Sequence, residues 1–320
     1  MSYGLIDEDP DPVAVRRLTF VPFLPDGRCV ALPGPQLPGG EVRDGEHYLL
    51  DSCLRIPVET VGFRPQRVHP FAVDGDHLYV WLDGDHAGGA GPPIAVTDGG
   101  EGFDGASAVV VRDAVGSFRT QSDASYYADN VRLLEPAYLR GTSVQAGSGF
   151  GGDAARWRAR REMIVDGLHR DGTFLDVGCA NGLLMESVQQ WAAERGLTIE
   201  PYGVDLAPGL VELARRRLPG WAERIVVGNA IDYLPADGRR FTFVHVLLDV
   251  VPPRRRADMI RHLLGALVEP GGRLLVSQYG RGGAADILQE LGFAVMGSSG
   301  ATGWASTAWL DAPKRSSGGR

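Results

Sequence analysis

Residues 173–182 read TFLDVGCANG and form the most informative stretch of the sequence. The apolar first half predicts a buried strand that runs directly into a glycine-rich turn. Gly178 permits a tight turn, and Gly182 lets a ligand or a strand approach the following helix closely. The free N–H groups at the start of that helix favour an anionic group by about 0.3–1 kcal/mol. The stretch therefore predicts a nucleotide-binding turn between a strand and a helix.

Strands and helices are expected to alternate on both sides of this turn. Asp153 is a good N-cap for a helix that reaches about His169. The later strands are expected at 173–177, 199–205, 224–228, 241–248 and 272–277, and the helices at 182–195, 208–217, 253–268 and 283–291. The alternation predicts an α/β fold with a doubly wound, mostly parallel sheet. Phe293–Met296 and Trp304–Leu310, joined by a short loop, predict an antiparallel pair at the end.

Two polar positions follow the next strands of this sheet. Asp205 ends the strand 199–205, where an acid can accept hydrogen bonds from both ribose hydroxyls of a nucleoside. Its alternative role is to cap the helix that begins at Pro208. Asn229 ends the strand 224–228 and could accept a hydrogen bond from an exocyclic amine, while the Ala230 N–H donates to a ring nitrogen. The alternative is an ordinary asparagine turn.

In this order, these features resemble the class I S-adenosylmethionine-dependent methyltransferases over residues 153–312. The stretch 176–182 is similar to the family's first motif, with Ala180 where a glycine is common. The resemblance implies a seven-stranded Rossmann-like sheet with a reversed last strand, and S-adenosylmethionine as cofactor. The residues that it implies for cofactor binding are Asp176, Gly178, Cys179, Ala180, Gly182, Asp205, Leu206, Asn229, Ala230 and Leu247. A nicotinamide dehydrogenase would instead require G-x-G-x-x-G, which residues 178–183 lack.

Chemistry in this family occurs at the tip of the fourth strand, here followed by Asp249. Asp249 is the predicted general base, and a helix N-cap or a cofactor contact is the alternative. His245 lies on the same face of that strand and is favoured as a core histidine with satisfied hydrogen bonds. The sequence predicts no metal site.

Aromatic residues before the sheet predict a lid over the site. The lid and substrate candidates are Tyr126, Tyr127, Phe150, Trp157 and Arg161. Ordinary packing is the alternative for the aromatic rings. Arg161 could bind a carboxylate of the acceptor or of the cofactor through two hydrogen bonds.

The first 118 residues read as short strands and turns. Strands are expected at Leu18–Leu24, Arg28–Leu32, Gln66–Val73, His77–Trp81 and Ala106–Val111, with a turn at 25–27 and a loop at 88–105. The segment 37–46, LPGGEVRDGE, resembles the opening of the Nudix box of diphosphate hydrolases. The resemblance implies a smaller α+β Nudix-like domain ahead of the methyltransferase sheet.

The metal-binding part of that box is degenerate. Its arginine position holds Leu54, and its three glutamate positions hold Arg55, Val58 and Glu59. Clustered carboxylates gather the divalent metals in such a site, and only one remains. Pro57 is expected to interrupt the helix. We therefore predict no magnesium-dependent diphosphatase activity.

Composition limits the class of protein. Of 320 residues, 44% are hydrophobic, and the net charge of −8 argues against a basic nucleic-acid-binding surface. The arginine runs 215–217 and 254–256 are interpreted as solvated helix faces. The three cysteines are widely spaced, which suits a reducing cytoplasm. No apolar run is long enough for a membrane helix.

These observations predict a two-domain cytoplasmic enzyme. The expected parts are a Nudix-like domain (1–118), a linker or lid (119–152), the methyltransferase domain (153–312) and a disordered tail (313–320). The expected function is methyl transfer to an oxygen or nitrogen of a small-molecule metabolite, without nucleic-acid or membrane partners. The alternatives are a non-catalytic cofactor-binding module and a diphosphate hydrolase. The sequence gives no prediction of the acceptor or of the oligomeric state.

Overall fold

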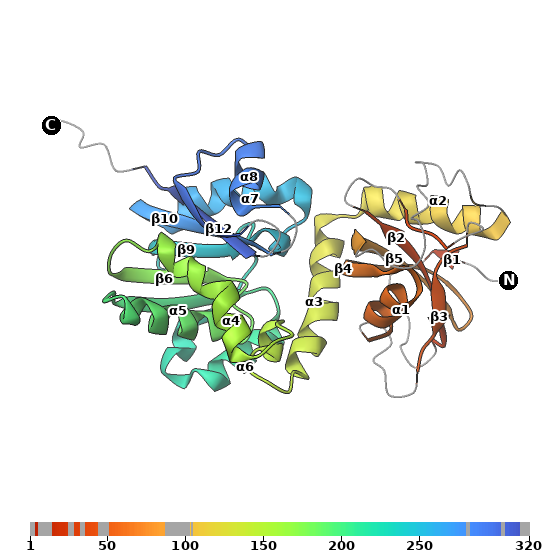
Figure 1. The fold of residues 1–320 in the computed structure, drawn as a ribbon, viewed down its shortest axis with the longest axis horizontal. Helices are drawn as coiled ribbons and strands as arrows, with labels where there is room; N and C mark the ends of the chain where they lie inside the picture. The colour runs from red at the N-terminus through yellow and green to blue at the C-terminus, as the bar shows by residue number, and fades with distance from the viewer. Residues whose placement is uncertain are drawn as a thin grey trace. The chain divides into compact units, whose positions relative to one another are not determined.

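The computed structural model describes residues 4–5, 15–24, 29–32, 36–43, 51–86, 103, 105–279, 282–301 and 305–313. The chain divides into two compact units, Met1–Leu133 and Leu134–Arg320 (Figure 1). The division falls inside the segment 119–152, which the sequence predicts as a linker. Within the described ranges, no helix has the length and apolar character needed to cross a bilayer.

The described strands of the first unit form a five-stranded sheet in the order β1-β4-β5-β2-β3. They are β1 (Gly4–Leu5), β2 (Arg17–Phe23), β3 (Gly39–Glu41), β4 (Phe63–Asp74) and β5 (His77–His86). β2 runs parallel to β5, and the other neighbouring pairs are antiparallel. The predicted strand at Arg28–Leu32 is wrong, because the described residues there form only isolated bridges, at Cys29 and Leu32. The predicted turn at 25–27 and nearly all of the predicted loop at 88–105 lie outside the described residues.

Both faces of this sheet are apolar, because successive side chains along its strands pack on opposite sides. Val80 of β5 packs in a cluster with Ile56 of α1 (Asp51–Val61). The next residue, Trp81, packs in a separate cluster with Val111 of α2 (Gly105–Thr120). Successive side chains of a strand point to opposite faces. The sheet therefore lies between α1 and α2.

Two expectations for the first unit are corrected by these helices. Ala106–Val111 is part of α2 and not a strand. Its β-branched residues favour a strand, but Val110, Val111 and Ala114 form a buried helical stripe against the sheet. Pro57 does not interrupt α1, which continues through it to Val61.

The second unit begins within α3 (Asp123–Leu139), a helix that runs through much of the predicted linker. Asp153 is confirmed as an N-cap, because its carboxylate accepts a 2.8 Å hydrogen bond from the Arg156 N–H. The helix that it caps, α4 (Ala154–Arg161), is shorter than predicted and continues as a 3₁₀ helix, Glu162–Gly167. A short 3₁₀ turn, Ala146–Ser148, precedes it.

The described strands of the second unit form a seven-stranded sheet in the order β11-β12-β10-β9-β6-β7-β8. They are β6 (Gly172–Val177), β7 (Ile199–Asp205), β8 (Ile225–Val227), β9 (Phe241–Leu247), β10 (Val268–Tyr279), β11 (Gly297–Ala301) and β12 (Ala305–Asp311). β8, β7, β6, β9 and β10 are parallel, and β12 runs antiparallel to both of its neighbours. The doubly wound sheet with a reversed last strand is therefore confirmed.

The helices of this unit lie close to their predicted ranges. They are α5 (Leu183–Glu194), α6 (Pro208–Arg217), α7 (Arg256–His262) and α8 (Ala284–Glu290), with 3₁₀ turns at Pro219–Arg224, Leu248–Val250 and Pro253–Arg255 and a π-helical turn at Leu263–Leu267. The expected strand Phe293–Met296 is wrong, and β11 forms at Gly297–Ala301 instead. The small residues of β11 allow close pairing with β12, where a side chain at Gly297 would meet the Trp309 ring.

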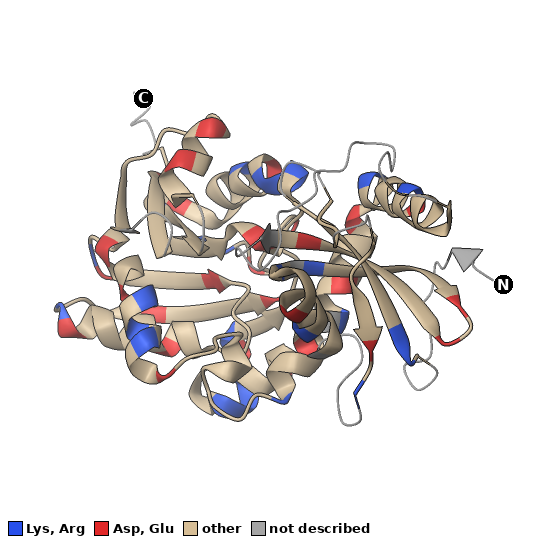
Figure 2. Ribbon diagram, turned by 45° about the vertical axis from the view of Figure 1, so that its right-hand side comes forward, with Lys and Arg blue, Asp and Glu red and all other residues tan. Residues whose placement is uncertain are grey.

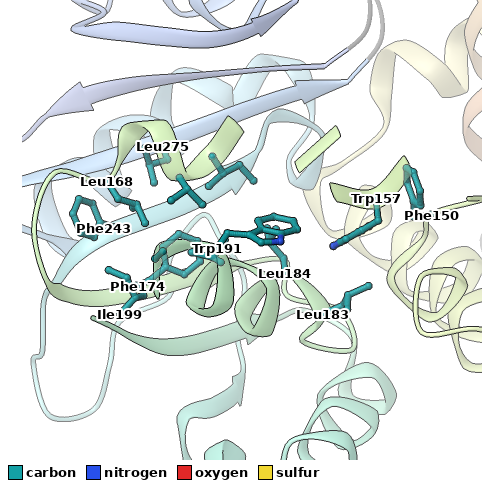
Figure 3. Close-up of a cluster of buried hydrophobic side chains, with 14 residues drawn as sticks. Phe150, Trp157, Leu168, Phe174, Leu183, Leu184, Trp191, Ile199, Phe243 and Leu275 are labelled. Atoms are coloured by element: carbon teal, nitrogen blue, oxygen red, sulfur yellow. The ribbon is translucent and has the colours of Figure 1, made fainter. Parts of the chain in front are cut away.

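A buried apolar cluster joins α4, α5 and the sheet. Figure 3 shows Trp157 and Phe150 at one end of this cluster, and Phe174 and Phe243 in the sheet at the other. The Trp157 indole N–H donates to the Ser187 hydroxyl at 3.0 Å. This packing fixes α4 beside the strand that leads into the glycine-rich turn.

Candidate functional site

The glycine-rich loop follows β6 at the carboxyl edge of the parallel strands. Gly178 has φ +85° and Gly182 has φ +75°, so both need the left-handed backbone that glycine allows. Ala180 also has a positive φ, +45°, which costs an alanine about 1–2 kcal/mol. The N–H groups of Gly178 and Cys179 both donate to the Val204 carbonyl, at 2.8 and 3.1 Å. The loop is therefore fastened to the end of β7.

The side chain of Asp205 also holds the glycine-rich loop, through a hydrogen bond. Its carboxylate accepts hydrogen bonds from the Ala180 N–H at 2.8 Å and from the Ala207 N–H at 2.9 Å. Burial raises the pKa of Asp205, and the bonds from Ala207 and Ala180 oppose that rise. Ala207 is the N-cap of α6 and has no side-chain capping bond, so Asp205 binds the residue before the helix and does not cap it. A contact with ribose stays a prediction.

The residues predicted to surround an adenine lie at the ends of neighbouring strands. Asn229 follows β8, and its side-chain oxygen accepts from the Ile231 N–H at 3.2 Å. Ala230 is buried, and Leu206 and Leu247 are half-buried at the ends of β7 and β9. These positions share one edge of the sheet, and their contacts with a cofactor stay predictions.

Asp176 is buried in β6 two residues before Gly178. One carboxylate oxygen, Oδ1, lies 2.9 Å from His245 Nδ1 on β9. Its other oxygen has no hydrogen bond to a described residue. His245 is itself buried, with both ring nitrogens hydrogen-bonded, as predicted for a core histidine.

Asp249 lies in the 3₁₀ turn directly after β9. The adjacent residue, Val250, approaches Gly178 so closely that a Cβ there would stand 3.1 Å from Val250 Cγ1. The side chain of Asp249 keeps solvent access, yet the surrounding protein desolvates the carboxyl and raises its pKa. The charges of Arg256 and Arg161 oppose that rise. Asp249 therefore lies beside the glycine-rich loop, and its raised pKa makes the ionised carboxylate a stronger base.

Arg161 is surrounded by aromatic rings at the end of α4. Its guanidinium carbon lies 3.6 Å from the centre of the Tyr279 ring, 4.9 Å from Trp157 and 5.3 Å from Phe150. Figure 3 shows Trp157 and Phe150 side by side, with ring centres 5.5 Å apart. Burial lowers the pKa of Arg161, and Tyr279 and Asp249 oppose that shift. Arg161 forms no ion pair with any described residue, so an anion can complete its surroundings.

Tyr126 and Tyr127 belong to the first unit. Tyr126 is 3% exposed and packs edge-on against Tyr127. The guanidinium of Arg67 lies 5.1 Å from its ring centre. Phe150, Trp157 and Arg161 lie together within the second unit, and Tyr126 and Tyr127 pack within the first.

The sequence analysis missed two residues of the second unit, Tyr138 and Glu135, at the end of α3. Burial raises the pKa of Tyr138, and Asp249 and Asp205 raise it further. Its hydroxyl occupies the space where a Gly149 side chain would project. The Glu135 carboxylate likewise blocks a side chain at Gly209, in the first turn of α6. Closely spaced glycines at 147 and 149 were the only sequence signal of this contact.

A second contact joins the segment after α3 to the glycine-rich loop. Asn181 Nδ2 donates to the Val144 carbonyl at 2.8 Å, and a side chain at Gly147 would meet Nδ2 at 2.9 Å. Arg217 Nε donates to the Asn181 carbonyl at 2.8 Å from the other side. The loop is therefore clamped between α6 and residues 144–147.

The arginine runs are engaged in local contacts. Arg215 pairs with Glu212 at 2.7 Å, and Arg217 pairs with Glu186 at 2.8 Å. Arg256 Nε donates to the Leu248 carbonyl at 3.0 Å. Figure 2 shows acidic and basic positions interspersed along the ribbon.

In the first unit, the remaining carboxylate of the degenerate box is paired with arginines. Glu59 Oε2 lies 3.1 Å from Arg55 and 3.4 Å from Arg43. The described residues contain no group of three or more His, Cys, Asp or Glu side chains that could hold a metal ion. The three cysteines are buried and unbridged.

One family model and several solved structures are similar to this chain. A family model described as a methyltransferase domain matches residues 174–272. No curated protein matches the chain. The solved structures that are similar to it include the N-methyltransferase NodS from Bradyrhizobium japonicum WM9 with S-adenosylhomocysteine. NodS is 16% identical, with a TM-score of 0.43, and the match covers 58% of this chain and 99% of NodS.

Two further structures are similar to this chain. The O-methyltransferase NcsB1 from neocarzinostatin biosynthesis is 16% identical, with a TM-score of 0.43, over 61% of this chain and 66% of NcsB1. The [4+2]-cyclase SpnF is 15% identical, with a TM-score of 0.38, over 54% of this chain and 84% of SpnF. Likenesses this distant do not specify a reaction. The matched domain model places a methyltransferase domain at residues 174–272, in the second unit.

Proposed function

We propose that the second unit transfers a methyl group to an oxygen or nitrogen of a small-molecule metabolite. The observation that carries the proposal is Arg161, whose guanidinium lies among Tyr279, Trp157 and Phe150 without an ion pair to a described residue. Asp249, the predicted base, influences the pKa of Arg161. A partly buried cation beside a base suits a compact acceptor that carries a carboxylate.

The residues of the loop fit the predicted cofactor. Asp176 Oδ2 has no hydrogen bond to a described residue and can accept one from a cationic amino group. A Cβ at Gly178 would stand 3.1 Å from Val250 Cγ1, so glycine allows the loop to approach Val250 without a side chain between them. When bound, S-adenosylmethionine supplies a methyl group on a positively charged sulfur. Asp176, Gly178 and Asp205 would hold it.

The remaining residues would orient the acceptor and take its proton. Methyl transfer is a direct displacement, and holding the two reactants in line can contribute about 7–11 kcal/mol. Asp249 would accept the proton of the attacking group. Phe150 and Trp157 would exclude water beside Arg161.

Two arms of one experiment test the Arg161 assignment. Arg161→Gln is titrated with S-adenosylhomocysteine and with 5′-methylthioadenosine, which lacks the carboxylate. Loss of affinity for the first ligand alone assigns Arg161 to the cofactor carboxylate. Unchanged affinity for both, with a raised KM for a carboxylate acceptor and not for its methyl ester, assigns it to the acceptor. If neither quantity changes, Arg161 binds no carboxylate.

A screen for turnover tests the function itself. The chain is incubated with methyl-labelled cofactor and a metabolite extract, and labelled small molecules are identified. Binding of S-adenosylhomocysteine without any labelled product would favour the alternative, a cofactor-binding module that does not turn over.

For the first unit, we propose a Nudix-like fold without hydrolase activity. The support is Glu59, the last carboxylate at the metal positions, which pairs with Arg55 and Arg43. Two guanidinium groups at this carboxylate oppose the binding of a divalent cation. The unit would then serve recognition of the acceptor, dimerisation or docking.

A further inference from the structure

Four polar side chains from four adjacent strands form a continuous hydrogen-bonded chain inside the second sheet. Asp176 Oδ1 lies 2.9 Å from His245 Nδ1, and His245 Nε2 lies 3.0 Å from Ser277 Oγ. Ser277 Oγ lies 2.7 Å from Thr307 Oγ1. Asp176 is in register with His245, and Ser277 with Thr307. All four residues are buried, with exposures of 2%, 1%, 0% and 1% in chain order.

Hydrogen-bond chemistry gives this chain a direction. In the arrangement with an ionised Asp176 and a neutral His245, the carboxylate accepts from the Nδ1 proton and the ring accepts on Nε2. Ser277 must then donate to Nε2, and Thr307 must donate to Ser277. This arrangement gives each hydroxyl and each ring nitrogen in the chain a partner. It leaves Asp176 Oδ2 as the carboxylate oxygen without a partner among the described residues.

The order Asp–His–Ser is also that of a hydrolytic triad. Ser277 is fully buried, and its oxygen is already hydrogen-bonded to both His245 and Thr307. A substrate carbonyl cannot reach it. The chain therefore does not serve as a nucleophilic site, and its only end near the glycine-rich loop is Asp176, two residues before Gly178.

We propose that His245, supported by Ser277 and Thr307, is a positioning residue that orients the Asp176 carboxylate toward the cationic amino group of the bound cofactor. The proposal rests on the cofactor-binding role proposed for Asp176. Without the His245 donor, the carboxylate loses its fixed rotamer and a hydrogen bond to its charged form. The cofactor then loses a preorganised partner at its methionine end and keeps its contacts at the adenosine end.

We call the hydrogen-bonded chain of Asp176, His245, Ser277 and Thr307 the relay. Two substitutions of His245 distinguish its contact with Asp176 from its contact with Ser277. The amide nitrogen of Asn is as many bonds from Cα as His Nδ1, so His245→Asn keeps a donor for Asp176. The amide of Gln matches Nε2 instead, so His245→Gln keeps the Ser277 side and removes the donor to Asp176. Asp176→Asn reports separately whether Asp176 contributes to cofactor binding.

Each variant of the full chain is titrated by calorimetry with S-adenosylhomocysteine and with 5′-methylthioadenosine, which lacks the amino-acid end. His245→Gln is expected to weaken the first ligand about tenfold or more, the effect of losing a hydrogen bond to a charged group. It should leave the second ligand unchanged. His245→Asn should bind both ligands nearly as the parent does. Thermal unfolding measures folding separately.

The opposite outcomes are distinct. If Asp176→Asn binds S-adenosylhomocysteine as the parent does, the proposed role of Asp176 fails, and the relay with it. If Asp176→Asn weakens binding but neither His245 variant does, only the relay is overturned. If both His245 variants lose the same affinity for both ligands, the role of His245 is purely structural, and the relay is overturned in that case too.

Ser277→Ala decides the question if the His245 variants fail to fold. It removes one hydroxyl from a fully buried site with little change in volume. The relay predicts a severalfold loss of affinity for S-adenosylhomocysteine and no change for 5′-methylthioadenosine. Thr307 is one hydrogen bond further from Asp176 than Ser277 is, so Thr307→Val should cause a smaller loss of affinity for S-adenosylhomocysteine. Unchanged affinity in both variants would overturn the proposal.

Discussion

The carboxylate of Asp205 accepts a 2.8 Å hydrogen bond from the Ala180 N–H, which joins the end of β7 to the glycine-rich loop. Its other oxygen accepts from the Ala207 N–H at 2.9 Å. Asp205→Ala leaves both buried donors without a partner. We expect the free energy of unfolding to fall by about 1–3 kcal/mol and S-adenosylhomocysteine to bind more weakly. Chemical denaturation and calorimetric titration measure the two effects.

Asp237→Ala is the matched control for this change. Asp237 lies on the surface, where it pairs with Arg239 at 3.1 Å. It should affect neither stability nor binding appreciably. A folded Asp205→Ala protein with the affinity of the parent would remove Asp205 from the cofactor site.

Gly149→Ala tests the contact between Tyr138 and the segment before α4. Gly149 has φ +72°, and its Cβ would overlap the Tyr138 hydroxyl. Left-handed strain and overpacking together are expected to cost about 2–4 kcal/mol of stability. The cofactor affinity should fall if Tyr138 belongs to the site.

Gly151→Ala provides a comparison in the same segment. A Cβ at Gly151 meets no atom within 4 Å, and its φ is not in the left-handed region. Its melting temperature and affinity should match those of the parent. Equal behaviour of the two variants would refute the role of the Tyr138–Gly149 contact.

Asp249→Asn tests the proposed base through the pH dependence of turnover. Burial raises the pKa of Asp249, and a base must be ionised to accept a proton. With an acceptor found in the labelled screen, kcat should rise with pH through that raised pKa and level off above it. Asp249→Asn should remove this rise and lower kcat by about 10²–10⁴-fold.

Binding of S-adenosylhomocysteine should survive Asp249→Asn. Asp258→Asn, on the exposed surface of α7 beside Arg261, should leave the pH profile intact. A variant at position 249 that keeps the pH-dependent rise would show that another group, or none, accepts the proton.

The first unit is expected to release no phosphate from nucleoside diphosphates in the presence of Mg²⁺. Glu59 pairs with Arg55 at 3.1 Å and would have to exchange a guanidinium for a metal ion. A panel of such substrates with a phosphate assay checks this expectation. Turnover that disappears in Glu59→Gln would restore the hydrolase.

The sheet of the second unit was predictable because local signals agreed there with the packing. Gly178 and Gly182 mark a turn that only glycine adopts easily, and Pro208 marks the start of α6 where predicted. The strand 199–205 has the predicted bounds. Because the apolar runs between these markers are short, the bounds of each strand can shift by few residues.

The failures occurred where tertiary packing overrode local preference. Val109, Val110 and Val111 favour a strand, yet Val110 and Val111 are buried together with Ala114, at helical spacing, against the sheet of the first unit. Tyr138 could not be assigned to the site from the sequence around it, because Asp205 and Asp249, whose charges act on it, come from distant parts of the chain. The relay has the same property, because Asp176 and Thr307 meet His245 and Ser277 only through strand order.

The reversed strand β12 has a consequence for biosynthesis. It fits between β10 and β11, both of which leave the ribosome before it. Until residues 305–311 emerge, the edge of β10 has no neighbour on that side, and β11 has none among the described strands. An unpaired apolar edge is a template for pairing with other nascent chains. Translation that stalls before Ala305 should therefore yield a product that aggregates.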